Sequence, residues 1–534
     1  MEKRTLLAIA LSIIILVAFS YLSPQRPVQI KEKPREAVKE VLEEKEELPE
    51  HAGIPPAQVE ISAEEKEIHV ETDLYSAVFT TKGGTIKKWA LKEYADKEGN
   101  PLSLVSPDFA VPPLSIILKG DSADSPAKIN YNVDKDSIKL DSFNKSKTLS
   151  FSYTDASGLS IRKIFTFYKD NYRVDFTTEV KGVRSYKVAL GSGFGIYDEK
   201  GTWVHIGPTL LKESDKIDID RGNIEGIGFL KRLTGRKSKN EVEYKGTIWW
   251  IAQEDKYFAS ALASLSRDNN VIVWNREKDG NNKTSNAEIA FEVTGEKGEF
   301  LLYAGPKKDE ILREYNAGLE HIIDFGFFSI LSRPLFWLLK FLYRVVGNYG
   351  WAIVLITLIV RIPFIPLINK SQKSMKKLQA VQPHMAALKE KYKKDPQKLQ
   401  KETMELYKKH KVNPVGGCLP MLIQLPVFFA LYKILLIAIE IRGAPFILWI
   451  QDLSEKDPYY VLPIAMGLSM VLQQKMTPSG MDPKQAKIMM LMPIVFTFMF
   501  LTFPSGLVLY WVISNLLSII QQYFVNKKTK SSAA

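Results

Sequence analysis

Arg361 is the residue of this sequence with the most demanding chemistry, because it lies inside a long apolar stretch. The stretch WAIVLITLIVRIPFIPLIN runs from Trp351 to Asn369. With the valines before it, about 20 apolar residues are available, enough to span a hydrocarbon layer of roughly 30 Å. Arginine keeps its proton in proteins, so this charge must be hydrated, paired or carried to the interface by its long side chain. The two interpretations are an arginine that reaches the interface and a wet cavity within the bilayer.

Other polar residues at a similar depth favour the cavity. Counted from the ends of their own apolar stretches, at Gly417 and Val525, Gln424 and Ser518 are both seven residues in, and the whole set lies roughly 10 to 16 Å deep at 1.5 Å per residue. A serine or threonine alone often bonds only to its own helix, so the argument is the shared depth. The predicted groove residues are Arg361, Thr357, Gln424, Ser514, Asn515 and Ser518, with Trp511 added as a further substrate contact.

The sequence places no carboxylate beside Arg361, and this separates two functions. An ion-coupled transporter needs a titratable or ion-binding partner near the middle of the membrane. The only candidate acid, Glu440, is expected at the far interface. One positive charge in a wet site that is open to lipid suits a transient polar or acidic peptide segment instead. A protein-handling membrane factor is therefore better supported than a transporter.

The remaining composition gives little support to an enzyme. Cys418 is the only cysteine, so no intrachain disulfide can form, and the six histidines are scattered without metal-ligand spacing. The sequence contains neither a glycine-rich phosphate loop nor a nucleophile elbow. We therefore predict no catalytic residue, no metal and no cofactor.

The net charge of +12 belongs to the second half of the chain. From His321 onward there are 26 Lys and Arg against 10 Asp and Glu, whereas the first 320 residues hold 46 against 50. An apolar run from Leu6 to Leu22 is either a cleaved signal peptide or an anchor, and we favour an uncleaved membrane anchor over residues 1–22. Residues 23–58 are rich in Pro, Glu and Lys and are predicted to form a disordered tether.

Residues 59–305 have the pattern of an all-β sandwich. Leu149, Phe151 and Tyr153 alternate with serines, and the β-forming run from Ile161 to Tyr168 precedes a Lys-Asp-Asn turn. Such a domain is more typical of binding or structural roles than of catalysis. Residues 306–346 follow as a linker and an amphipathic helix at the interface, in which Lys340 and Arg344 share one face.

Four further apolar stretches follow Asn369 and give six predicted transmembrane helices, five of them in a core over residues 347–525. Their bounds are 418–439, 459–472, 488–503 and 507–525. The loop over residues 440–458 is mainly acidic, whereas residues 475–487 and the tail over residues 526–534 are basic. By the positive-inside rule both termini are cytoplasmic and the β-domain lies outside.

Residues 370–412 are predicted to form a basic cytoplasmic helical hairpin. From Lys370 to Lys411 there are 13 lysines and four acids, Pro383 should bend the first helix, and Asp395 should cap the second. Topology alone could explain the charge, and the alternative is binding to ribosomal RNA or anionic phospholipids. The candidate contact residues are Lys389, Lys391, Lys393, Lys394, Lys398 and Lys401.

Four motifs make the chain resemble the YidC/Oxa/Alb family of membrane protein insertases, in its Gram-negative form with a large periplasmic domain. They are NPVGGCLPMLIQLPVFFALY from Asn413, APFILWIQDLS from Ala444, DPYYVLPI from Asp457 and FPSGLVLYWVISN from Phe503. The resemblance implies a polytopic helical protein whose five core helices enclose a hydrophilic groove open to cytoplasm and lipid, with an arginine matching Arg361. It further implies an essential cytoplasmic hairpin, cooperation with ribosomes and the Sec translocon, and a sugar-binding-like β-sandwich that is largely dispensable for insertion. The short tail and Lys433, which stands where a tyrosine or apolar residue is expected, depart from the pattern.

We accordingly predict an insertase and chaperone of the bacterial inner membrane that acts on nascent membrane proteins. Its expected partners are the Sec translocon, the ribosome through the basic hairpin, and anionic phospholipids, but not DNA. The alternative is a polytopic transporter or lipid scramblase with a periplasmic sensing domain.

Overall fold

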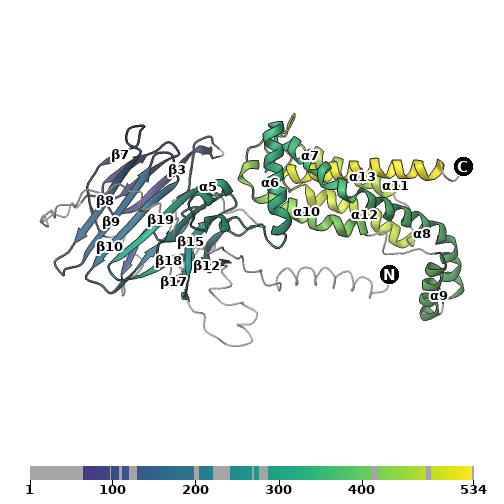
Figure 1. Cartoon of the computed structure of the whole chain (residues 1–534), viewed down its shortest axis with the longest axis horizontal. Coiled ribbons are helices and arrows are strands. Elements are labelled where there is room, and N and C mark those ends of the chain that lie inside the picture. Colours follow the sequence, from purple (N-terminus) through teal and green to yellow (C-terminus); the bar gives the residue numbers. More distant parts are fainter. Residues whose placement is uncertain are drawn as a thin grey trace. The chain divides into compact units, whose positions relative to one another are not determined.

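The computed structural model describes residues 64–96, 98–106, 111–118, 129–197, 204–219, 241–266, 270–275, 287–393, 395–410, 419–476 and 483–531. The described residues form two compact units that divide between Ile323 and Asp324. Figure 1 shows the strands gathered in the first unit and the long helices in the second. The predicted anchor and tether lie outside the described residues.

The first unit is built from three sheets. One five-stranded sheet has the order β4 (Pro101–Ser103), β3 (Thr85–Ala95), β2 (Tyr75–Thr80), β1 (Glu67–Glu71) and β7 (Ser137–Lys139). The nine-stranded sheet has the order β13 (Asp215–Asp218), β12 (Gly207–Lys212), β15 (Ile248–Glu254), β16 (Phe258–Ser264), β19 (Lys297–Pro306), β10 (Arg173–Lys181), β9 (Ser160–Tyr168), β8 (Ser146–Thr154) and β6 (Asn132–Val133). The second five-stranded sheet has the order β14 (Glu241–Tyr244), β17 (Asn270–Asn275), β18 (Ala287–Thr294), β11 (Ser185–Ala189) and β5 (Ile116–Leu118).

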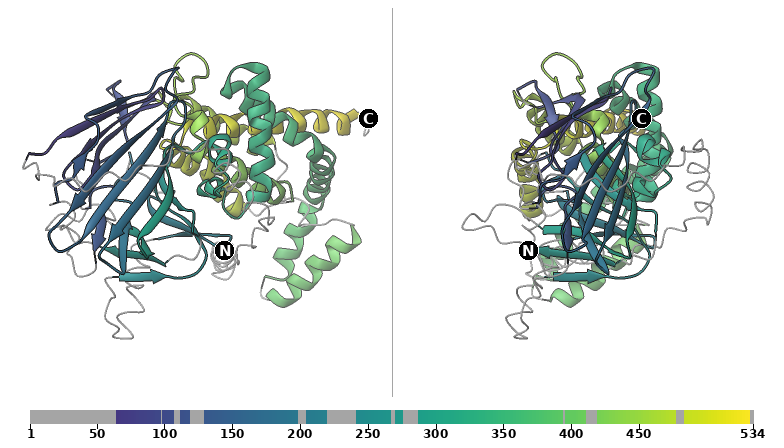
Figure 2. Two further views of the ribbon diagram at one scale, coloured as in Figure 1. Left: turned by 60° about the vertical axis from the view of Figure 1, so that its left-hand side comes forward. Right: turned by 90° about the vertical axis from the view of Figure 1, so that its left-hand side faces the viewer.

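Aromatic side chains join the nine-stranded sheet to both of the smaller sheets. The ring of Phe79 on β2 lies 5.1 Å from that of Phe165 on β9, and Phe291 on β18 lies 5.7 Å from Phe300 on β19. Each of these side chains is almost fully buried, so they form the interior between the layers visible in Figure 2. The prediction of an all-β sandwich is confirmed, and β8, β9 and β10 pair in antiparallel register as the alternation indicated.

The chain leaves the sheets through a segment that polar contacts fasten to them. It contains α5 (Asp309–Glu314) and the 3-10 turn η2 (Leu319–Ile322). The indole of Trp250 donates to the carbonyl of Gly318 over 2.9 Å, and the phenol of Tyr315 donates to Asn171 Oδ1 over 2.7 Å. The division between the two units therefore falls inside the segment predicted as linker and interfacial helix.

The second unit is helical. Its elements are α6 (Ser329–Val346), α7 (Tyr349–Arg361), the 3-10 turn η3 (Ile362–Phe364), α8 (Ile365–Lys391), α9 (Pro396–Lys409), α10 (Leu419–Ile437), the 3-10 turn η5 (Ile439–Ile441), α11 (Val461–Met476), α12 (Pro483–Phe500) and α13 (Ser505–Ser531). Helix α7 packs against α6 and α13, and α13 packs against α11. Helices α8 and α9 project from this bundle as a hairpin (Figure 1).

The stretch around Arg361 is not one uninterrupted α-helix. Asn348 caps α7 by accepting a hydrogen bond from the backbone N–H of Trp351, and α7 ends at Arg361. The 3-10 turn follows because Pro363 and Pro366 remove two backbone donors within four residues. Arg361 is thus placed at the end of α7.

Two expectations for the hairpin have different outcomes. Asp395 caps α9, its side chain accepting from the N–H of Lys398 over 3.0 Å, as predicted. Pro383 lies inside α8, which runs from Ile365 to Lys391, and the bend predicted at this proline stays a prediction. The loss of one internal hydrogen bond is tolerated there.

Among the described residues, two helical runs are long and apolar enough to cross a membrane. They are Tyr349–Lys391 and Ser505–Asn526, and Gln424–Ile437 and Met490–Phe500 are shorter apolar helices. Helices α10 to α13 begin and end within a few residues of the predicted bounds, except that α13 runs six residues beyond Val525. The count of six transmembrane helices stays a prediction.

Candidate functional site

Arg361 is held by the serines of α13. Its Nη1 donates to the carbonyl oxygen of Ser514 over 2.8 Å and lies 3.3 Å from the hydroxyl of the same residue. Its Nη2 donates to the hydroxyl of Ser518 over 2.6 Å. Ser514 and Ser518 are four residues apart and therefore lie on the same face of α13. This face receives the planar guanidinium at the end of α7.

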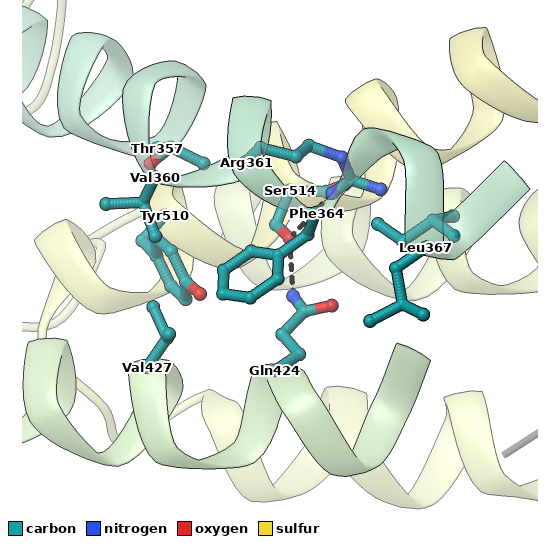
Figure 3. Close-up of a pocket in the computed structure, with 10 residues that line it drawn as sticks. Thr357, Val360, Arg361, Phe364, Leu367, Gln424, Val427, Tyr510 and Ser514 are labelled. Atoms are coloured by element: carbon teal, nitrogen blue, oxygen red, sulfur yellow. Dashed lines mark hydrogen bonds between the residues drawn. The ribbon is translucent and has the colours of Figure 1, made fainter. Parts of the chain in front are cut away.

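Gln424 extends the contact to a third helix. Its Nε2 donates to Ser514 Oγ over 2.6 Å, from the N-terminal half of α10 (Figure 3). A hydroxyl oxygen accepts two hydrogen bonds, so Ser514 can accept from Arg361 and Gln424 together. The three side chains thereby connect α7, α13 and α10, which lie far apart in the sequence.

A cavity of about 40 Å³ opens beside this group. Its described lining residues are Thr357, Val360, Arg361, Phe364, Leu367, Ile368, Gln424, Val427, Tyr510 and Ser514. A water molecule needs roughly 10 to 15 Å³ of such space, so a few waters fit but a peptide segment does not. Figure 3 shows Arg361 and Gln424 approaching Ser514 from opposite sides, with the ring of Phe364 beside the hydrogen bond between Gln424 and Ser514.

The charge in this cavity has no acidic partner among its described lining residues. The three hydrogen bonds of Arg361 go to uncharged oxygens, and its Nε is buried without a hydrogen-bond partner. A buried donor of this kind is costly unless water or a ligand oxygen satisfies it. The site is therefore suited to accept an oxygen-bearing or acidic group.

The structure separates the predicted groove residues into two groups. Arg361, Thr357, Gln424 and Ser514 line the cavity, although the hydroxyl of Thr357 donates to Ile353 of its own helix over 2.6 Å. Ser518 contacts Arg361 just outside the lining.

Asn515 and Trp511 lie elsewhere on α13. The amide of Asn515 donates to Ser469 of α11 over 2.9 Å. The ring of Trp511 packs against Phe428 of α10, 4.7 Å away, and Phe500 of α12, 5.1 Å away.

Tyr510 is a lining residue that the sequence analysis missed. It lies four residues before Ser514 and thus on the same face of α13. This spacing was the available signal, but a tyrosine in an apolar stretch resembles ordinary core.

The predicted contact lysines of the hairpin are exposed where the structure describes them. These are Lys389, Lys391, Lys393, Lys398 and Lys401, whereas Lys394 lies outside the described residues. The ammonium groups of Lys391 and Lys398 each lie 5.4 Å from the ring centre of Tyr392, so both lie close to this ring at the turn. The hairpin thus concentrates positive charge at its tip.

The β-unit contains a titratable cluster that the scattered histidines did not reveal. Ligand atoms of His205, Asp218 and Glu254 lie within 4.8 Å of one another. Both oxygens of Glu254 already contact ammonium groups, at 2.5 Å from Lys216 and 2.6 Å from Lys307. Burial alone would raise the pKa of Glu254, but these two lysines hold it below its ordinary value. The cluster is an ion-pair network, and its two cations oppose a bound metal ion.

Fold and site together define an integral membrane protein with a helical bundle and a separate β-sandwich domain. The model of the 60Kd inner membrane protein family matches residues 341–532, and that of the YidC periplasmic domain matches residues 67–338. The chain belongs to the YidC family of membrane protein insertases.

Curated relatives match over their full length. "Membrane protein insertase YidC" of Geotalea uraniireducens is 40% identical, over 99% of this chain and 100% of the relative. The protein of the same name from Geobacter metallireducens is 40% identical, over 100% of both chains. A solved structure titled "Active YidC insertase crystal structure with the first transmembrane domain resolved" covers 87% of this chain and 94% of its own, with 20% sequence identity and a TM-score of 0.38.

Proposed function

We propose that this protein inserts nascent membrane proteins by offering their polar flanks a hydrated, positively charged site inside the bilayer. The supporting observation is Arg361, whose partners are uncharged oxygens and whose Nε has no hydrogen-bond partner. An acidic or carbonyl-rich client flank supplies the acceptors that this guanidinium lacks. No bond is made or broken in the client, so the activity is not enzymatic.

The mechanism requires the cavity to widen. At about 40 Å³ it holds a few waters, and a peptide flank enters only when α7, α10 and α13 move apart. The bonds from Arg361 to Ser514 and Ser518 would then be exchanged for bonds to the client. The groove shortens the apolar distance that the flank must cross, while the hydrophobic segment of the client moves along the outer face of the bundle into lipid.

The remaining assignments belong to the same proposal. We infer six transmembrane helices in the bacterial inner membrane, with both termini cytoplasmic and the β-domain over residues 59–305 periplasmic. The basic hairpin over residues 370–412 would contact the ribosome and anionic phospholipids through its exposed lysines, and the Sec translocon would share clients. Ion-coupled transport is disfavoured because the described cavity lining lacks a carboxylate.

Reconstitution tests this function directly. The purified protein is placed in sealed phospholipid vesicles, and a small single-span client is synthesised outside them. Protease protection of the translocated client end is the readout. We expect protection above the level of empty vesicles, and vesicles with the parent protein that protect no more client than empty ones would contradict the proposal.

A further inference from the structure

The loop from Ala444 to Tyr460 presents apolar side chains to the outside at one end of the bundle. Leu448 is 74% exposed and Tyr459 69%, and Ile447 is also exposed. Ile447 and Leu448 are consecutive, and the ring of Tyr459 lies 6.5 Å from that of their neighbour Trp449. Contiguous exposed apolar groups mark a surface that contacts something other than water.

Backbone hydrogen bonds connect residues within the first half of the loop. The N–H of Phe446 donates to the carbonyl of Ile450, and the N–H of Leu453 donates to Ala444, both over 2.9 Å. Leu448 has φ of +53°, a left-handed conformation that disfavours leucine. The surrounding hydrogen bonds therefore fix a strained residue whose side chain contributes little to the interior.

Asp457 fixes the other half of the loop. It is 1% exposed and accepts from the indole of Trp449 over 3.0 Å and from the N–H of Leu462 over 2.7 Å. The ring of Trp449 in turn lies 6.5 Å from that of Tyr459. The partly buried Trp449 and the exposed Tyr459 are thereby attached to the start of α11.

The loop also touches the starts of both long apolar runs. Asn348, which caps α7, donates to the carbonyls of Pro445 and Phe446 over 3.1 and 3.2 Å. The hydroxyl of Ser505, the first residue of α13, donates to the carbonyl of Asp452 over 3.0 Å. The close approach to α7 depends on Gly350, where a Cβ atom would lie 2.0 Å from the ring of Phe446.

These contacts fix the height of the loop relative to a membrane. Because α7 and α13 begin the two candidate spans, the loop lies at the level where hydrocarbon gives way to headgroups, at the end away from the α8–α9 hairpin. Tryptophan and tyrosine concentrate at this level in membrane proteins, and Trp351 at the start of α7 is half exposed there. An exposed leucine at this height meets lipid.

We propose that residues 444–460 form a lipid-inserted wedge whose tip, Ile447 and Leu448, enters the interfacial layer of that leaflet. The strained backbone directs the leucine outward, and the aromatic residues beside it lie among the headgroups. The wedge holds the starts of α7 and α13 at a fixed depth. The surface thus contacts phospholipid rather than a protein partner.

The experiment uses the full chain with Cys418→Ser and one new cysteine, labelled with an environment-sensitive fluorophore. Leu448→Cys tests the tip, and Glu455→Cys, an exposed polar position on the same loop, is the matched control. The labelled proteins are reconstituted in vesicles of phosphatidylethanolamine and phosphatidylglycerol. Lipids with a nitroxide at the headgroup or on the acyl chain report depth.

We expect the label at position 448 to emit at shorter wavelength than that at position 455. Nitroxide on the upper acyl chain should quench it at least about twofold more strongly, as for side chains buried 5 to 10 Å into the headgroup boundary. Water-like emission at position 448, with free access for an aqueous quencher, would overturn the proposal and favour a protein partner. Ile447→Cys repeats the measurement, so that a disturbed fold at position 448 does not decide the result.

Discussion

The hydroxyl of Ser518 lies 2.6 Å from Nη2 of Arg361, so the one charge among the described residues lining the cavity is already bound by the protein itself. A second serine, Ser514, binds Nη1 of the same guanidinium. The described structure is therefore a closed form of the proposed site. A client flank must compete with these two hydroxyl-bearing residues for the guanidinium.

The first prediction concerns the charge of Arg361. Arg361→Lys should retain most insertion activity, because it keeps the charge and loses only the planar fork. Arg361→Leu should fold, because removing a charge from the bilayer relieves roughly 2.5 to 3.5 kcal/mol on insertion scales. It should impair clients with acidic flanks more than clients with neutral ones. The measurement is insertion of a client series with graded flank charge, beside the thermal stability of each variant.

A purely structural arginine would behave differently. In that case stability and insertion should fall together, or neither should change. If Arg361→Leu inserts every client as well as the parent does, the charge is not the working group of the site.

The second prediction concerns the serine that holds the charge. Ser518→Ala removes the acceptor that Nη2 uses and should lower the free energy of unfolding by about 1.5 to 3 kcal/mol, as for a hydrogen bond to a charged group. The guanidinium of Arg361 should then bind acidic client flanks more readily than in the parent. The insertion of clients with acidic flanks, relative to clients with neutral flanks, should therefore rise. Thermal unfolding and the graded client series are the two readouts.

Ser469→Ala provides the matched control. It removes a hydroxyl that binds Asn515 on the other side of α13, outside the cavity lining. Stability should fall here too, without a change in the preference for client charge. Equal shifts in preference for both serine variants would argue against competition for Arg361.

The third prediction concerns the basic hairpin. Reversing Lys389, Lys398 and Lys401 to Glu should weaken binding to ribosomes or anionic vesicles while the orientation in the membrane is kept. Binding by the parent should fall steeply with salt, with a slope of about −0.7 to −0.9 per phosphate contact in a logarithmic plot. Co-sedimentation at several salt concentrations measures this. Charge reversal of Lys88 and Lys139, which are exposed in the β-unit, is the control and should leave this binding unchanged. If binding by the parent does not depend on salt, the lysines of the hairpin serve only to set the orientation in the membrane.

The fourth prediction concerns pH and the ion-pair network of the β-unit. Because the folded-state pKa of Glu254 is below its ordinary value of 4.5, its contribution to stability is full above pH 4.5 and is lost as pH falls through the folded pKa. Each unit of pKa depression corresponds to about 1.4 kcal/mol. Unfolding of the β-unit in the full chain, followed by tryptophan fluorescence from pH 7 downward, reports this loss.

Glu254→Gln isolates this carboxylate from the other acids. At pH 7 it should destabilise the unit by about 3 kcal/mol, because the buried ammonium group of Lys307 loses the carboxylate that it pairs with, whereas Lys216 keeps its ion pair with Asp218. Its stability should also fall less than that of the parent below pH 4.5. If the free energy of unfolding changes with pH in the same way in both proteins, the role assigned to Glu254 is contradicted.

The fifth prediction concerns the β-domain as a whole. The proposed site lies entirely in the second unit, so deletion of Val59 to about Gly305 should leave insertion mostly intact. A deletion extended through α6 should lose activity, because α6 packs against α7 and α10. Insertion is compared at equal amounts of correctly oriented protein. Loss of insertion by the shorter deletion would show that the β-domain takes part.

The sequence predicted the elements better than it predicted their contacts. Alternation of side chains identified β8 to β10, and the Asp-Pro pair located the start of α9, because both signals are local. The depth of a residue in the membrane also follows from counting along its helix, and for this reason Ser514 and Asn515 were both predicted to line the groove. Adjacent residues nevertheless point about 100° apart around a helix, so Asn515 faces α11 instead of the cavity.

Contacts between distant segments were not predictable in the same way. His205, Asp218 and Glu254 lie 13 or more positions apart along the chain, and only strand pairing brings them together. Tyr510 and the two serines of α13 became a site only when α7 and α10 were placed against them. The spacing of side chains along a helix determines which residues share a face. Which other helix packs against that face depends on the packing of the whole bundle.

The proline-bounded turn after Arg361 has a mechanical consequence. Pro363 and Pro366 remove two backbone donors and disfavour helical geometry at Ile362 and Ile365, so this turn is softer than the helices on either side. Movement of the α8–α9 hairpin should therefore bend the chain at this turn first, while Gln521 of α13 still holds Ile365 and Asn369 at the start of α8. Bending at the turn should pass little of that movement to α7, so that the guanidinium of Arg361 keeps its contacts with Ser514 and Ser518.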